Sequence, residues 1–164
     1  MNHQGPLFDS LPERLSSSRP LSQARVIGLF AGIGGIELGL HQAGHSTAMV
    51  CEIEPTAQAV LRHHFPEVPL VADIREIDRL PPAEIIAGGF PCQDISSAGR
   101  GAGIEGKRSG MWGHMARIVG EVRPQYVFVE NSPMLTSRGL GVVLGDLAEM
   151  GYDAQWGCIS ARDA

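Results

Sequence analysis

Short apolar runs alternate with amphipathic segments from residue 25 onward, and this alternation constrains the fold more than any other feature. The apolar runs predict strands at residues 26–30, 46–52, 69–73, 84–90, 125–130 and 152–160. The amphipathic segments predict helices at residues 36–44, 55–65, 110–122 and 140–151. One helix between successive strands is typical of βαβ units, in which helices cover both faces of a parallel sheet. The sequence therefore predicts a doubly wound α/β fold with a mostly parallel sheet.

The length of the chain fits one folded domain preceded by a leader. Its 164 residues are 43% hydrophobic, which supports one core and leaves little room for a second. Residues 1–25 are rich in Ser, Pro and Arg and show little periodicity, so we expect a flexible leader there. Residues 26–164 are then expected to form the domain.

Several classes of protein are disfavoured. The sequence has no apolar run of about 18 residues and no signal-peptide pattern, so we expect a cytoplasmic protein with no membrane partner. Its three cysteines are widely spaced without a CxxC pair, which argues against a disulfide framework and a zinc site, and we expect no metal. Four residues in apolar patterns are expected to pack in the core: Cys51, Cys158, Trp112 and Trp156.

The net charge of the chain also limits its partners. Nucleic-acid binders that act alone carry a basic face, whereas this chain has a formal net charge of −5. If DNA or RNA is the substrate, we expect much of the binding surface to come from elsewhere.

Candidate functional residues follow the predicted strands. In doubly wound folds, ligands bind beyond the carboxyl ends of the strands. The residues at those places are 30–35, Glu52, Asp73, Pro91–Cys92 and Glu130–Asn131. We therefore expect the functional site at this edge of the sheet.

The first three of these places indicate a nucleoside cofactor. The segment FAGIGG (30–35) is a glycine turn that opens a helix, although alone it would equally fit a tight turn without a ligand. The dinucleotide pattern needs a third glycine where Glu37 stands, and an acid there would repel a pyrophosphate. Glu52 can accept from both ribose hydroxyls, and Asp73 from an adenine amine. S-adenosylmethionine fits this set better than NAD.

The last two places indicate nucleophilic chemistry. Cys92 follows the fourth predicted strand, and a thiolate there is a nucleophile. Glu130 follows the fifth strand, so its carboxyl could protonate a ring nitrogen while the thiolate adds to the ring. The glycine-rich segment after the cysteine carries Arg100, Lys107 and Arg108, which indicates a loop that closes over an anionic polymer.

Six motifs together resemble one family. FAGIGG (30–35), Glu52, ADI (72–74), GFPCQDIS (89–96), SGMW (109–112) and ENS (130–132) occur in the order and approximate spacing of DNA cytosine-5 methyltransferases. The resemblance covers about residues 26 to 160. It implies a Rossmann-like, S-adenosylmethionine-dependent methyltransferase fold, so that residues 26–164 would be a partial catalytic domain.

The resemblance also implies roles for individual residues. Cys92 would be the nucleophile, Glu130 the acid that engages ring nitrogen 3, Asn131 a residue that shapes the pocket, and Gln93 a neighbour of it. The cofactor-binding residues would be Phe30, Gly32, Gly34, Glu52, Ile53, Asp73, Ile74, Pro91 and Met111. The loop that contacts double-stranded DNA would include Ser96, Arg100, Lys107 and Arg108. The cytosine would have to flip out of the duplex to reach the thiol.

The sequence departs from the family pattern in three places. Ser132 stands where members usually have an aliphatic residue, and Ile53 where they often have an aromatic one. The chain stops at residue 164, before the segments that would bring a base-contacting Arg, the target-recognition region and the closing helix. We therefore expect a fragment, a truncated gene product or one subunit of a split enzyme, with a complementing chain as partner and little or no activity alone.

Three alternatives stay open. A non-catalytic module that binds a cofactor or a partner would explain the missing C-terminal part. A relative that methylates cytosine in tRNA would use the same chemistry. An NAD-dependent oxidoreductase is disfavoured by Glu37 and by the absent phosphate site.

Overall fold

The computed structural model describes residues 23–91 and 110–159. These residues form a five-stranded sheet in the order β3-β2-β1-β4-β5, and every neighbouring pair of strands is parallel. The strands are β1 (Arg25–Leu29), β2 (Ser46–Cys51), β3 (Leu70–Val71), β4 (Ile85–Gly88) and β5 (Tyr126–Val129). The α/β prediction is confirmed. The chain builds the sheet outward from β1 in one direction and then in the other, so β1 and β4 flank the switch point where such folds bind ligands.

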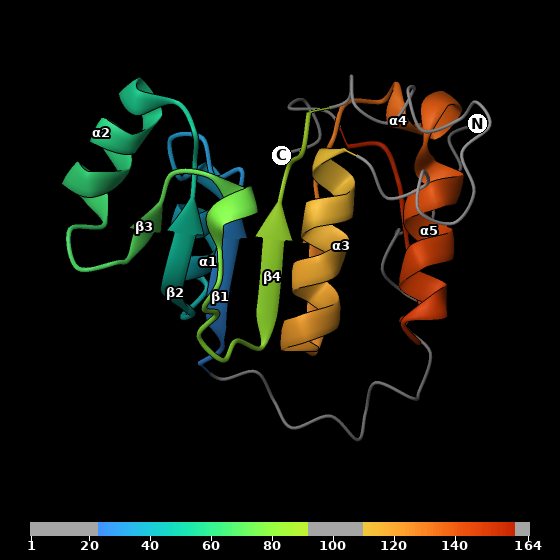
Figure 1. Cartoon of the computed structure of the whole chain (residues 1–164), viewed down its shortest axis with the longest axis horizontal. Helices are drawn as coiled ribbons and strands as arrows, with labels where there is room; N and C mark the ends of the chain where they lie inside the picture. The colour runs from blue at the N-terminus through green and yellow to red at the C-terminus, as the bar shows by residue number, and fades with distance from the viewer. Residues whose placement is uncertain (1–22, 92–109, 160–164) are drawn as a thin grey trace, which may run out of the picture.

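Helices connect the strands as expected, with two short additions. The helices are α1 (Gly35–Gln42), α2 (Pro55–His64), the 3₁₀ turn η2 (Ile74–Glu76), α3 (Met111–Val122), α4 (Leu135–Arg138) and α5 (Leu140–Glu149). Figure 1 shows α3 between β4 and α5, and α2 at the opposite side of the molecule beyond β3. The η2 turn and α4 were not predicted, because each is too short to show a helical period.

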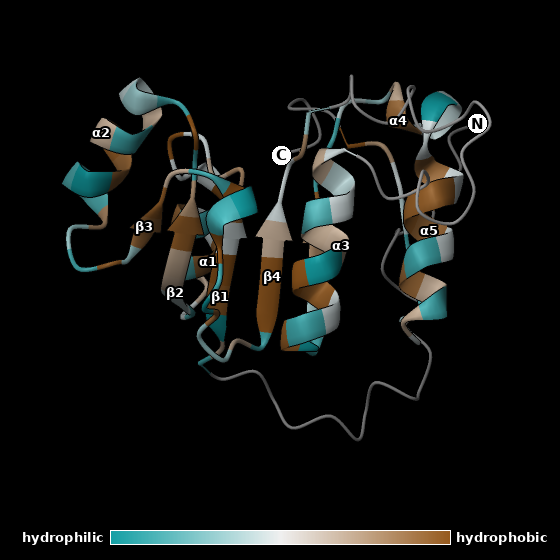
Figure 2. Ribbon diagram, viewed as in Figure 1, coloured by the Kyte–Doolittle hydropathy of each residue, from teal (hydrophilic) through white to brown (hydrophobic). Residues whose placement is uncertain are grey.

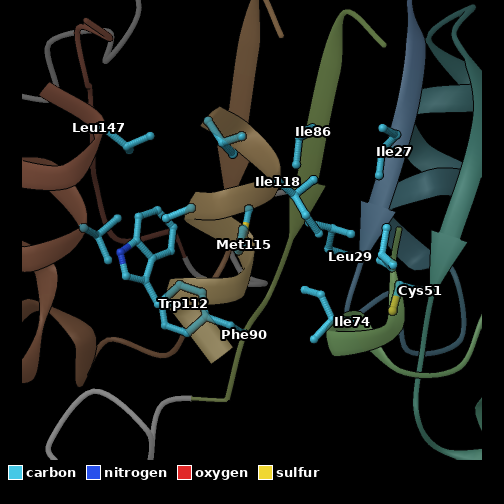
Figure 3. Close-up of a cluster of buried hydrophobic side chains, with 14 of the residues drawn as sticks. Ile27, Leu29, Cys51, Ile74, Ile86, Phe90, Trp112, Met115, Ile118 and Leu147 are labelled. Carbon is cyan, nitrogen blue, oxygen red and sulfur yellow. The ribbon is translucent and has the colours of Figure 1, made fainter. Parts of the chain in front are cut away.

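The main core lies between one face of the sheet and α3 with α5. Ile27, Leu29 and Ile86 point from the sheet toward Met115 and Ile118 of α3, and all five are fully buried. Figure 3 shows these side chains, with Leu147 of α5 and Trp112 of α3 beside them. In Figure 2, β4 is brown along most of its length, whereas α3 carries both brown and teal residues, as expected for a helix with one face in the core.

A smaller core covers the opposite face. Val26, Ile85 and Ala87 of the sheet pack there with Ile36 and Leu40 of α1. Buried side chains thus alternate between the two faces along β1 and β4, as the pleat of a strand requires. Helices on both faces make the fold doubly wound.

Four of the observed strands are shorter than predicted, β3 and β4 by three residues each, and the sixth predicted strand does not form in residues 152–159. The third was expected over residues 69–73, but β3 ends at Val71 because the Asp73 side chain accepts a hydrogen bond from the Arg75 backbone N–H and starts η2. The sixth, at residues 152–160, is absent: residues 152–159 form no strand.

The tail after α5 also corrects two core predictions. Trp156 is 61% exposed and Ile159 is 77% exposed, so these two side chains do not pack in the core. Cys158 is exposed as well, contrary to expectation. Cys51 and Trp112, in contrast, are buried as predicted. In the part of the chain that the structure describes, no helix is long and apolar enough to cross a bilayer.

Candidate active site

The glycine turn after β1 has an unusual backbone. The strand ends at Leu29 because Phe30 adopts a positive φ of 55°, which is uncommon for a residue with a side chain. The Ala31 N–H donates to the Cys51 carbonyl at 3.0 Å and ties the turn to the end of β2. At Gly34, φ is 88°, and a Cβ would lie 2.8 Å from the Phe65 ring and 2.9 Å from Leu61. Gly34 therefore lets the turn approach α2 closely.

Glu52 fastens this turn to the start of α2. The side chain is 8% exposed, and its two oxygens accept from different backbone groups: Oε2 from the Gly32 N–H at 2.7 Å and Oε1 from the Glu54 N–H at 2.8 Å. Each carboxylate oxygen has a second lone pair. Glu52 can therefore anchor the turn and still accept a hydrogen bond from a ligand hydroxyl.

Gln58 supports this anchor and is a functional residue that the sequence pattern did not predict. Its side-chain nitrogen donates to the Glu52 carbonyl at 2.7 Å, and its oxygen accepts from Arg62 at 3.1 Å. Gln58 is 8% exposed and lies one turn before the buried Leu61 on α2. A polar residue on the apolar face of a helix was the available signal.

Asp73 is held by Arg75. The backbone N–H and the guanidinium Nε of Arg75 each donate to Asp73 Oδ1 at 2.9 Å, and Nε and Nη2 also contact Oδ2. These hydrogen bonds lower the pKa of the Asp73 carboxyl to about 2. Asp73 is therefore ionised at neutral pH, and a ligand amine would share the carboxylate with Arg75.

The other predicted cofactor residues differ in exposure. Ile53 is 60% exposed beside Glu52, so its side chain is available to a ligand. Pro91 is exposed, and Met111 is half-buried at the start of α3. Ile74 is 4% exposed and packs in the main core, while its carbonyl accepts from Arg117 at 3.3 Å. A ligand could therefore meet the backbone of Ile74 but not its side chain.

Glu37 belongs to the first turn of α1, but its side chain is buried between the helix and the sheet. The residue is 1% exposed, and a Cβ at Gly28 would lie 2.1 Å from Glu37 Oε1, so the carboxyl packs against β1. Burial raises the pKa of this carboxyl. The expected repulsion between Glu37 and a phosphate is therefore wrong. The missing third glycine still argues against a dinucleotide site.

Glu130 follows β5 and lies beside Gly89, which follows β4 and precedes Cys92 in the sequence. The strands β4 and β5 are neighbours, as predicted, and the Glu130 N–H donates to the Gly88 carbonyl at 3.0 Å. A Cβ at Gly89 would lie 2.5 Å from Glu130 Oε2, so the carboxylate rests against the backbone of Gly89. The Glu130 residue is exposed. An acid is thus placed beside the segment that ends in the thiol.

The Asn131 side chain binds the backbone of the segment that follows β4. The Asn131 side-chain nitrogen donates to the Phe90 carbonyl at 2.7 Å, and the side-chain oxygen accepts from the Ser132 N–H at 2.9 Å. Because Phe90 and Asn131 are 41 residues apart, this contact links the ends of β4 and β5. It gives Asn131 a structural use beside the pocket role that the family resemblance implies.

Several predicted residues lie outside the described residues: Cys92, Gln93, Ser96, Arg100, Lys107 and Arg108. Of the other two cysteines, Cys51 is buried, and burial with the nearby Asp73 and Glu52 charges raises its pKa to about 12. Among residues 23–91 and 110–159, no group of three or more His, Cys, Asp or Glu side chains is arranged to hold a metal ion.

Comparison with known proteins places these motifs in a family. A family model described as C-5 cytosine-specific DNA methylase matches residues 24–164. The Type II methyltransferase M2.BsuMI of Bacillus subtilis (strain 168) is 41% identical over 146 residues, which cover 84% of this chain and 38% of that protein. The Type II methyltransferase M1.ScrFI of Lactococcus lactis subsp. cremoris is 34% identical over 153 residues, covering 89% and 39%.

Solved structures share the fold. A DNMT2 mutant from Spodoptera frugiperda has a TM-score of 0.59 at 21% identity, and the match covers 77% of this chain and 41% of that one. A protein assigned as a DNA modification methyltransferase, encoded within an Escherichia coli prophage, has a TM-score of 0.58 at 27% identity, covering 76% and 36%. The chain therefore spans about two fifths of the length of the curated relatives it matches.

Proposed function

We propose that this chain, which belongs to the C-5 cytosine-specific DNA methylase family, carries the nucleophile and the methyl-donor site of an enzyme that methylates carbon 5 of cytosine in DNA. The observation that carries the proposal is the close contact between the Glu130 carboxylate and Gly89, just after β4. An acid and the segment leading to Cys92 are thus neighbours, as addition of a thiolate to a protonated cytosine ring requires.

The residues at the other end of the edge fit S-adenosylmethionine. Glu52 can accept from the ribose hydroxyls with the lone pairs that Gly32 and Glu54 leave unused, and the ionised Asp73 can accept from the adenine amine. The exposed side chain of Ile53 offers an apolar surface for the base. The bound cofactor would supply an electrophilic methyl group. We propose the same binding role for Phe30, Gly32, Gly34, Ile74, Pro91 and Met111.

The proposed chemistry follows from the groups present. The target cytosine leaves the stack, because a thiol cannot reach carbon 6 within the duplex. The Cys92 thiolate forms a bond to carbon 6 while Glu130 donates a proton to nitrogen 3, and the displaced electron pair makes carbon 5 nucleophilic. Carbon 5 would take the methyl group as the methyl–sulfur bond of the donor breaks and leaves a thioether, and carbon 5 would then lose its proton to a base. The carbon–sulfur bond breaks, the nitrogen 3 proton is released, and methylcytosine leaves the thiolate.

Double-stranded DNA is the proposed macromolecular partner. The description of the matching family model, C-5 cytosine-specific DNA methylase, supports it, whereas the net charge of −5 does not provide a basic surface. We propose that a further polypeptide region, in the same or a complementing chain, supplies target recognition, and that Ser96, Arg100, Lys107 and Arg108 contact the DNA. We propose the cytoplasm as the place where such an enzyme acts.

Trapping on a duplex that contains 5-fluorocytosine tests the proposal. Fluorine cannot leave carbon 5 as a proton does, so the covalent adduct should persist. We expect an adduct that needs S-adenosylmethionine, that forms when chain 1–164 is joined by the region for target recognition, and that Cys92→Ser abolishes. Cys158→Ser is the matched control, because Cys158 is an exposed cysteine outside the site. An adduct that survives Cys92→Ser, or no adduct with the complete protein, would overturn the proposal.

A further inference from the structure

Trp112 joins α3 to α5 through a part-buried hydrogen bond. Its side chain is 4% exposed at the first turn of α3, and the indole Nε1 donates to Asp146 Oδ2 of α5 at 2.8 Å. Figure 3 shows the indole nitrogen on the side of the ring that faces α5. The two residues are 34 positions apart, so the bond is a tertiary contact.

The same indole packs on Phe90. The two ring centroids are 5.4 Å apart at an interplanar angle of 51°, and Phe90 is 2% exposed. The carbonyl of Phe90 accepts from Asn131 on its other side. Phe90 is therefore held both by its ring and by its backbone, two residues before Cys92 in the sequence.

We propose that Asp146 is a positioning residue for catalysis, which acts by holding Trp112 in the orientation that packs on Phe90. The inference rests on the proposed function for the role of Cys92. The contacts among Asp146, Trp112 and Phe90 do not depend on that function. Asp146 lies within α5 and does not follow a strand, and the family resemblance assigns it no role.

The physical reason is the need of the indole N–H for an acceptor. A buried donor that loses its partner costs more than the bond contributes when it is present, so the side chain moves to find another acceptor or water. A carboxylate acceptor is stronger than a neutral one and directional, so it selects one rotamer of Trp112. Without Asp146, we expect the indole to rotate and to withdraw its ring from Phe90.

A purely structural role would give different results. If the bond merely joined α3 to α5, its loss would lower the stability of the protein and leave the end of β4 unchanged. If it positions Phe90, its loss also disturbs the hydrogen bond from Asn131 to the Phe90 carbonyl. The side-chain amide of Asn131 is therefore the reporter that separates the two roles, and it needs no catalysis.

The test compares Asp146→Ala, Asp146→Asn, Trp112→Phe and the double variant Asp146→Ala/Trp112→Phe. Asp153→Ala is the control, since Asp153 is an exposed acid just beyond α5. In ¹⁵N-labelled chain 1–164, Asp146→Ala should shift the Asn131 side-chain amide signal, which Asn131→Asp identifies by its loss. Asp146→Asn keeps an acceptor oxygen, so its Asn131 amide signal should lie close to the wild-type position. The control should leave it unchanged.

The catalytic arm uses the complete protein and the 5-fluorocytosine duplex. We expect Asp146→Ala to slow adduct formation about tenfold while the KM for S-adenosylmethionine stays within about twofold. Trp112→Phe removes the donor that needs a partner, so the double variant should be faster than Asp146→Ala.

The outcomes separate the two proposals. If the wild-type protein gives no adduct, the proposed function fails, and the amide signal still decides the positioning role. An Asn131 signal in Asp146→Ala that matches the wild type would overturn the inference, as would a wild-type rate of adduct formation. If Asp146→Ala does not fold, Asp146→Asn compared with Trp112→Phe provides the same test.

Discussion

Glu52 follows β2 and Glu130 follows β5, so the same kind of side chain stands at both ends of the candidate site in different surroundings. Glu52 is 8% exposed, and both of its oxygens accept from backbone N–H groups. Glu130 is exposed, and its carboxylate rests against Gly89. One acid is part of the scaffold that shapes the cofactor end, and the other is available to a substrate. Removing each should therefore damage different properties.

The largest effect is expected for Glu130→Gln on the rate of methyl transfer. Glutamine keeps the size of the side chain but does not protonate the cytosine ring, so we expect a loss of about 10³-fold in the complete protein. Because Glu130 is exposed, the free energy of unfolding should change by less than about 0.5 kcal/mol. Single-turnover methylation and urea unfolding measure the two quantities. A rate within about threefold of the wild type would rule out the proton-transfer role.

Glu52→Gln should show the opposite pattern. The amide nitrogen of glutamine would face a backbone N–H, so one donor loses its acceptor and we expect a loss of about 2 kcal/mol in the free energy of unfolding. The Kd for S-adenosylmethionine should rise at least about tenfold. Glu54→Gln is the matched control, because the Glu54 side chain makes no cap hydrogen bond at the start of α2. Equal stability of the two variants would show that Glu52 is no anchor.

Gly89→Ala tests the contact that places the second acid. The new Cβ would lie 2.5 Å from Glu130 Oε2 and should push the carboxylate away. We expect adduct formation to slow about tenfold with little change in cofactor affinity. Gly141→Ala in α5 is the control, since nothing lies within 4 Å of that position and alanine favours a helix. Similar rates in both variants would contradict the placement of Glu130.

The smallest effect concerns pH at the cofactor end. The depressed pKa of Asp73 keeps its carboxylate charged until the pH falls through about 2. In Arg75→Ala, that pKa should return toward the ordinary 3.8, so part of the charge is lost near pH 4. We expect the affinity for S-adenosylmethionine to fall by up to about twofold between pH 7 and pH 4 in this variant, and less in the wild type. Titration calorimetry at both pH values would show it; identical pH dependence would refute it.

The sheet and the edge that holds the site were predictable because apolar runs and strand ends depend on local sequence. The β-strands buried on both faces, such as β4, appear as continuous apolar runs, and residues after neighbouring parallel strands must share an edge. Because the fourth and fifth strands were expected to be neighbours, Glu130 was predicted to lie near Cys92. The features that failed are those that depend on the environment of a single residue.

Three residues show why. The Asp73 side chain ends β3 early by capping η2, which a hydrophobic pattern does not encode. Glu37 is a charged residue by type, yet it lies buried against Gly28 because glycine leaves the space for it. Trp156 has the same apolar character as Trp112, but it is 61% exposed, whereas Trp112 is buried with a hydrogen-bond partner and a ring to pack on. Such outcomes depend on contacts between residues distant in sequence.

Calorimetric titration of S-adenosylmethionine into Glu52→Gln and Glu130→Gln, side by side with the wild-type chain, tests the division between the two acids most directly. We predict that Glu130→Gln binds the cofactor as the wild type does, within about twofold, and that Glu52→Gln binds at least about tenfold more weakly. Equal weakening in both variants, or weakening in Glu130→Gln alone, would contradict it.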